Sequence, residues 1–130
     1  MHDPSIILPN IKWMLEVVSR IERRISRINH PTDFVESEFG LDMLDAICMM
    51  LLELGESVKR LEKADQGQFI QSHPGVPWKK IVGTRNFIGH GYIELNERVI
   101  FEICKTHIPE FKMDLIRIID KLNTDDTQFT

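Results

Sequence analysis

The sequence predicts an all-α fold, a bundle of four or five helices in one domain. Apolar residues recur at helical spacing in every long segment, and no stretch alternates apolar and polar residues as a half-buried strand does. The chain of 130 residues and 15.2 kDa is long enough to bury one compact core. Hydrophobic residues make up 42% of it and charged residues 28%, the balance of an ordinary globular protein.

The first helix is predicted from an apolar seam that ends before Pro31. Successive seam residues are four and three positions apart in alternation, so they lie on one helix face. The seam consists of Ile7, Ile11, Met14, Val18, Ile21, Ile25 and Ile28. Proline ends the helix, and Thr32 or Asp33 can cap a short turn that follows it.

The second helix is predicted from a wider stripe between Leu41 and Leu61. The stripe consists of Leu41, Leu44, Cys48, Leu51, Leu54, Val58 and Leu61, and it is widened by Met43, Ile47, Met49 and Met50. Its width favours two buried faces, one toward the core and one toward a second subunit. A wide intramolecular core is the alternative.

The second half of the chain predicts a loop and three shorter helices. Residues 65–77 are rich in Gly and Pro and form a loop with room for one short turn. A third helix opens at Trp78 and ends near Gly89 or Gly91. Asn96 caps a fourth helix, and Pro109 fits the first turn of the last one. Their inward residues are expected to be Val99, Ile100, Ile103 and Cys104, and then Phe111, Leu115, Ile119 and Leu122. The helical domain covers residues 1–122, and residues 123–130 are expected to be a flexible tail.

The formal net charge of −4 disfavours a generic basic nucleic-acid-binding domain, though not a local basic site. Residues 31–57 contain seven acids and no Lys or Arg, whereas basic residues gather in 12–27 and 79–98. These runs fit solvated helix faces that pair across a bundle, or a polarised molecule with one face suited to an anion. Cys48 and Cys104, each alone in an apolar stretch, are expected to be buried thiols. Without a secretory signal pattern or a membrane-length apolar run, we expect a cytoplasmic protein with no membrane contact.

The candidate chemistry is concentrated in residues 78–92. On a helix, Arg85 shares a stripe with Trp78, Ile81, Ile88 and Tyr92, which places a guanidinium on a face that should be buried. The simplest interpretation is an ion pair with an acid of the second helix, Glu53 or Glu56.

His90 follows Arg85 by five residues, so the two side chains cannot stack but can converge on one phosphate-sized ligand. Asn86, one turn before His90, can orient its ring or bind the same ligand. A lone histidine beside glycines is more often a surface or capping residue. The five histidines show no metal-ligand spacing, so neither a metal nor another cofactor is expected.

The run from Arg85 to Tyr92 resembles the R-x4-H-x-Y signature of HepT-like HEPN-domain ribonuclease toxins, the partners of MntA-type minimal nucleotidyltransferase antitoxins. Residues 73–83 and 54–61 resemble two further segments of that family. The resemblance implies an antiparallel bundle that forms a homodimer, with a shared cleft lined by both subunits. It also implies metal-independent cleavage of RNA. Arg85 would hold the phosphate, His90 would act as general acid or base, and Asn86 would position the substrate. Tyr92 would be the residue to which the antitoxin attaches AMP.

A catalytically inactive HEPN protein is the alternative, one that serves as a nucleotide-binding or scaffold partner of the nucleotidyltransferase. The charge of −4 favours it, as do Met49 and Met50, which stand where polar residues are expected in the family. Arg85 and His90 oppose it, because both residues of the catalytic signature are present.

Overall fold

The computed structural model describes residues 4–91 and 95–128, and every regular element within these ranges is helical. The elements are α1 (Pro4–Ile25), η1 (Pro31–Phe34), α2 (Glu38–Ala64), α3 (Gln68–Gln71), α4 (Trp78–Gly91), α5 (Glu97–Glu102), the π-helical η3 (Ile103–His107) and α6 (Ile108–Gln128). The predicted all-α fold is therefore confirmed. None of the helices described is both long and apolar enough to cross a membrane.

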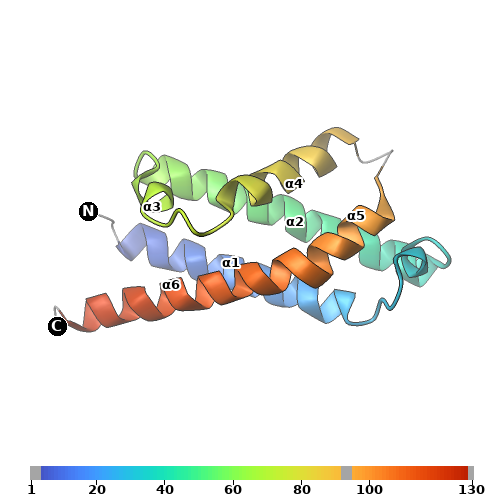
Figure 1. Ribbon diagram of the computed structural model, residues 1–130, viewed down its shortest axis with the longest axis horizontal. Helices are drawn as coiled ribbons and strands as arrows, with labels where there is room; N and C mark the ends of the chain where they lie inside the picture. Colours follow the sequence, from blue (N-terminus) through green and yellow to red (C-terminus); the bar gives the residue numbers. More distant parts are fainter. Residues whose placement is uncertain (1–3, 92–94, 129–130) are drawn as a thin grey trace.

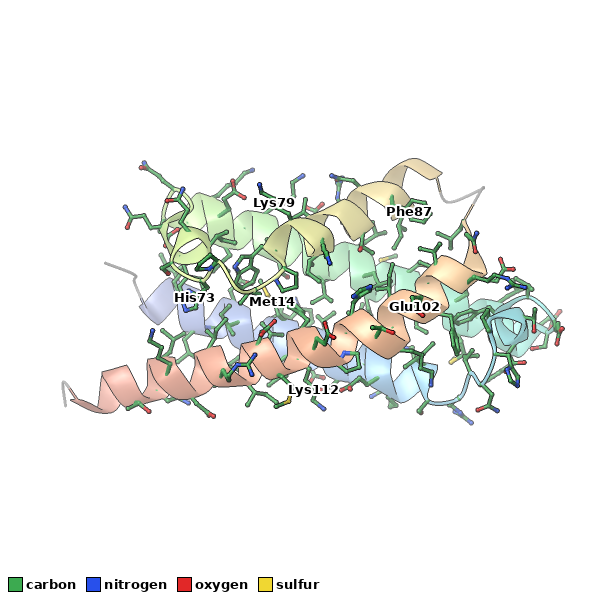
Figure 2. The ribbon with its side chains drawn as sticks, in the orientation of Figure 1. Met14, His73, Lys79, Phe87, Glu102 and Lys112 are labelled. Carbon is green, nitrogen blue, oxygen red and sulfur yellow. The ribbon has the colours of Figure 1, made fainter. Side chains whose placement is uncertain are left out.

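The long helices form an antiparallel bundle (Figure 1). Helix α1 contacts both α2 and α6, and α4 packs along α2. Helix α1 begins and α6 ends at the same end of the bundle (Figure 1). All seven residues of the predicted α1 seam are buried, and Met14 lies fully buried in the middle of the bundle (Figure 2). The seam thus provides the central part of the core.

The stripe predicted for α2 is buried except at its first residue. Leu41 is 44% exposed. The first turn of α2 faces η1 with Gly40 instead, and the two backbones are so close that a Cβ on Gly40 would collide with the Asp33 carbonyl. Of the residues that widen the stripe, Ile47 is buried, whereas Met49 is 60% exposed. Within this single chain, α2 therefore buries a core face and leaves an apolar side chain in solvent.

The connection between α1 and α2 contains the short turn that was expected, but its N-cap residue is His30 rather than Thr32 or Asp33. Asp33 lies inside η1, and its carboxylate accepts hydrogen bonds from the N–H groups of Asn29 and His30 at 2.9 and 3.0 Å. These two bonds lower the pKa of Asp33. The cap of α2 is Ser37, whose hydroxyl oxygen accepts the N–H of Gly40 at 2.9 Å.

The other predicted helix starts are confirmed. Helix α4 begins at Trp78, directly after Pro77, and the single turn of α3 lies in the predicted loop. The Asn96 side chain caps α5 by accepting the N–H of Arg98 at 2.9 Å.

Pro109 lies in the first turn of α6, as predicted, and η3 joins α5 to α6 without a loop. Pro109 has no N–H to donate and its ring crowds the preceding turn, which accounts for a widened π turn at this point. The buried stripe of α6 includes Phe111 and Leu115, as predicted, and then continues at a spacing of three rather than four residues. The buried residues are Ile108, Phe111, Leu115 and Ile118, while Ile119 and Leu122 are only half-buried.

Helix α6 continues to Gln128, past residue 123, where the sequence predicts a tail. No Gly or Pro follows Pro109, so nothing in the sequence ends the helix there. The Thr124 hydroxyl donates to the Asp120 carbonyl within the helix at 2.8 Å, which satisfies this polar side chain without breaking the turn.

Both cysteines are free and buried, as predicted. Burial raises the pKa of Cys48 and of Cys104 to about 12. Both side chains therefore stay protonated at neutral pH and serve as apolar core residues.

Candidate functional site

Helix α4 carries Arg85 and Asn86 on the outer side of the bundle. Trp78, Ile81 and Ile88 are buried, as the stripe predicts, and they fix the rotation of α4 about its axis. Arg85 lies on the edge of this stripe, and its side chain is 31% exposed rather than buried. The guanidinium is thus held by the core face of α4 and still reaches solvent.

Arg85 forms an ion pair with Glu56 of α2. Its Nε donates to Glu56 Oε1 at 2.5 Å, so the simplest interpretation of the sequence is confirmed, with Glu56 as the partner. Glu53 is not available for this role, because its carboxylate accepts hydrogen bonds from Arg60 and from the Trp13 indole. The bond from Arg85 lowers the pKa of Glu56, which keeps the carboxylate ionised at neutral pH.

Asn86 holds the guanidinium from a second side. Its Oδ1 accepts a hydrogen bond from Arg85 Nη1 at 3.1 Å. An arginine has five N–H donors in one plane. With Nε and one N–H of Nη1 engaged, the outer edge of the guanidinium keeps one N–H on Nη1 and two on Nη2 that form no hydrogen bond with the residues described here. This edge has the paired geometry with which arginine binds phosphate or carboxylate groups.

Gly55 lets α2 and α4 approach closely at this point. A Cβ on Gly55 would lie 2.8 Å from Arg85 Cγ and closer still to Arg85 Cβ. The aliphatic part of Arg85 therefore lies directly on the α2 backbone, where only glycine leaves room. The next residue, Glu56, then meets the guanidinium. The sequence contained this Gly-Glu pair, but its contact with Arg85 depends on how the two helices dock.

The remaining site residues are only partly described. The backbone of His90 belongs to α4, but its side chain lies outside the part of the chain that the structure describes. Tyr92 lies outside that part entirely. The predicted convergence of His90 on Arg85, and its contact with Asn86, therefore remain predictions. Within the described part of the chain, no three His, Cys, Asp or Glu residues are grouped so that they could hold a metal ion.

An apolar strip continues the site along α2. Met49, Leu52 and Glu56 are three and four residues apart, so they share one helix face. Met49 is exposed and Leu52 half-buried. The face that presents Glu56 to Arg85 therefore also presents apolar side chains to solvent.

A family model described as Ribonuclease HepT-like matches residues 14–118. The chain is 31% identical over 113 residues to "Putative RNase TTE0752" of Caldanaerobacter subterraneus subsp. tengcongensis, an alignment that covers 87% of this chain and 94% of that protein. It is 30% identical over 101 residues to "Putative RNase MJ0127" of Methanocaldococcus jannaschii, covering 76% and 80%. No solved structure matches the chain significantly.

A third relative has a longer chain. "Gamma-glutamylcyclotransferase and putative RNase MJ0434" of Methanocaldococcus jannaschii is 24% identical over 113 residues, which cover 87% of this chain and 47% of that protein.

Proposed function

Because the chain belongs to the HepT-like ribonuclease family, we propose that it is a metal-independent endoribonuclease and the toxin of a HEPN–nucleotidyltransferase toxin–antitoxin pair. One observation carries the proposal of catalysis. Glu56 and Asn86 hold the Arg85 guanidinium while its side chain stays 31% exposed, five residues before His90 on the same helix. The charge and geometry of the outer edge of the guanidinium suit a phosphodiester of RNA.

In the proposed reaction, Arg85 binds the scissile phosphate and stabilises the charge that develops on its oxygens. His90 acts as general base on the ribose 2′-hydroxyl or as general acid on the leaving oxygen, tasks suited to an imidazole with a pKa near ~6.5. The 2′-oxygen attacks the phosphorus while the bond to the 5′-oxygen breaks and that oxygen takes up a proton. Asn86 positions the substrate and, through its bond to Nη1, the guanidinium as well.

The site belongs to a homodimer in this proposal. The strip of Met49 and Leu52 beside Glu56 packs against a second copy of the chain, so that Arg85 and His90 of both subunits line one cleft. Burial of an exposed methionine and its apolar neighbour favours association. The partial exposure of Arg85 in a single chain fits a cleft that a second subunit completes.

Cleavage should survive chelation and should require the ribose 2′-hydroxyl. We expect a single-stranded RNA to be cut equally well with EDTA and with Mg²⁺, because Arg85 rather than a metal stabilises the phosphate. The same strand with one 2′-deoxyribose at the scissile position should stay intact there, because the nucleophile is missing. Gel analysis of end-labelled strands measures both. Loss of cleavage in EDTA that Mg²⁺ or Mn²⁺ restores would contradict this mechanism and favour catalysis by a metal.

An MntA-type nucleotidyltransferase should silence the enzyme by attaching AMP to Tyr92, the single tyrosine of the chain. Two helical turns of sequence separate Tyr92 from Arg85. The added phosphodiester can pair with the guanidinium, and the adenosine can occupy space that RNA needs. Incubation with ATP and the cognate transferase should therefore add AMP units, visible by intact mass, and stop cleavage.

The matched variant for this test is Tyr92→Phe, which removes only the hydroxyl that accepts AMP. It should cleave RNA at the parent rate and remain active after the same incubation. If the transferase silences Tyr92→Phe completely with no change in mass, inhibition works by binding of the partner alone.

An inactive partner of the nucleotidyltransferase is the second candidate function. It is favoured by the exposed Met49 in a position where the family is expected to carry a polar residue, and by the net charge of −4. Such a protein would bind the transferase or a nucleotide and leave RNA intact under every condition of the EDTA and deoxyribose experiment.

A further inference from the structure

A pocket of about 380 Å³ lies between the C-terminal half of α2, the turn that leads into α3, and the first half of α4. Its volume falls within the range of small-ligand sites. Trp78, Val82 and Ile70 contribute apolar walls. The indole of Trp78 is held in place, because its Nε1 donates to the His73 carbonyl at 3.1 Å and its ring packs edge-on against Phe111. The pocket therefore has a rigid apolar side.

The pocket borders the Arg85 site through Asn86. Asn86 lines the pocket, and its side chain accepts the hydrogen bond from Arg85 Nη1. A phosphate on the outer edge of Arg85 would therefore place the adjoining nucleoside beside the pocket mouth. No other described side chain belongs both to this pocket and to the Arg85 contacts.

The polar lining suits the edge of a nucleobase better than a phosphate. Gln66, Gln71 and Asn86 bring three side-chain amides, and each amide can both donate and accept. Single-stranded RNA is recognised in this way, with an unstacked base placed against flat or apolar side chains and read along its edge. Glu62 also lines the pocket and would repel an anion inside it. Lys79 also lines the pocket and makes no ion pair with the residues described, so its charge is available to a phosphate of the bound RNA strand.

The C-terminus of α2 places Gln66 at the wall of the pocket. Gln66 has φ 59° and is followed by Gly67 with φ 83°. Gln66 is the left-handed residue that ends α2, where the Gly67 N–H donates to the Glu62 carbonyl at 2.8 Å as helix C-termini commonly do. Glycine is the usual residue at such a position, yet this chain has a glutamine there, and Gln66 lines the pocket.

We propose that this pocket binds one unpaired base of the RNA strand, next to the phosphate that Arg85 holds, and gives the cleavage a base preference. The proposal rests on the ribonuclease function proposed above and adds the element that reads the substrate. The amides select a base by its edge and the apolar wall selects it by its shape. Because the pocket borders the Arg85 site, the preference applies to the base beside the scissile phosphate.

Gly83 offers a way to fill the pocket without disturbing the core. It lines the pocket, and a Cβ at this position would meet nothing within 4 Å. Gly83→Phe should occupy the pocket and Gly83→Ala should leave it open, so the second variant controls for loss of the glycine. Gln66→Gly removes one amide and supplies the usual residue for this left-handed position, which makes it a variant that cannot fail simply through unfolding.

The first measurement is binding to single-stranded RNA hexamers that cannot be cleaved because every 2′-hydroxyl is methylated. The parent and Gly83→Ala should prefer one base at one position of a randomised pool. Gly83→Phe should lose this preference and bind about tenfold more weakly, the size of effect expected when one stacked base is lost. Gln66→Gly should weaken the preference at the same position. Equal affinity and equal preference in all four proteins would overturn the base pocket.

The second measurement is sequencing of the ends produced from a cleavable random RNA. The parent and Gly83→Ala should cut with the preference seen in binding, and Gly83→Phe should cut more slowly and without it. Base-selective binding that depends on position 83, together with no cleavage by the parent, would overturn the ribonuclease function and leave the pocket standing. Cleavage whose base preference is unchanged in Gly83→Phe would overturn the pocket and leave the ribonuclease function standing.

Discussion

Arg85→Ala should slow RNA cleavage by about 10²–10³-fold, the usual cost of losing one group that stabilises charge in the transition state. The fold should tolerate this change, because Glu56 is 40% exposed and stays hydrated once its partner is gone. Arg85→Lys keeps the charge but cannot offer paired donors, so its rate should lie between the parent and Arg85→Ala. Single-turnover cleavage measures all three proteins.

Arg117→Ala is the matched control for Arg85→Ala. Arg117 is also paired with a carboxylate, that of Asp114, but both residues belong to α6 and the side chain of Arg117 is 68% exposed. Its loss should leave the cleavage rate unchanged. Circular dichroism and sedimentation should give the same helix content and subunit number for both alanine variants. An Arg85→Ala protein that is folded and cuts RNA at the parent rate would rule out Arg85 as the phosphate-binding group.

His90→Ala should lower the rate of RNA cleavage by about 10²–10⁴-fold, the usual effect of losing a general acid or base. In the parent, the rate should change with pH as the His90 imidazole gains or loses its proton. In His90→Ala, whatever rate remains should lose that dependence. If the variant retains both the rate and the pH dependence of the parent, the proton is moved by another group.

Gly55→Val should have the largest effect on the structure. Its Cβ would overlap the Arg85 side-chain stem, so α4 must move away from α2 or Arg85 must leave its place. Overpacking of this kind commonly costs about 1–3 kcal/mol of the free energy of unfolding, and a β-branched side chain against an immobile backbone belongs at the upper end. Because Arg85 is displaced by the same movement, we expect cleavage to fall together with stability.

Gly83→Ala is the matched control for Gly55→Val. Both glycines are in helices, but the space around Gly83 is open. This replacement should raise the free energy of unfolding by about 0.5–1 kcal/mol, the usual gain from alanine in a helix. Urea denaturation followed by circular dichroism measures both variants. If Gly55→Val is as stable and as active as the parent, the two helices do not need close contact at Gly55.

Local signals in the sequence determined the helices and most of the core. The α1 seam is buried at all seven positions because strict helical spacing leaves one way to bury it. Pro77 and Asn96 act within a few residues through backbone geometry and capping, so the starts of α4 and α5 could be predicted. The R-x4-H-x-Y run also predicted where the candidate site lies, without any knowledge of its contacts.

Only the tertiary structure decided how these helices meet. The sequence allowed either Glu53 or Glu56 to pair with Arg85, and the choice of Glu56 follows from the rotation of α2 against α4. Packing also decided that α6 buries Ile118 rather than Ile119, since both residues lie at helical spacing from Leu115. Gly55 and the pocket at Gln66 were likewise not visible in the sequence. Each depends on two segments that are distant in the chain, and spacing within one helix carries no information about the surface on which it docks.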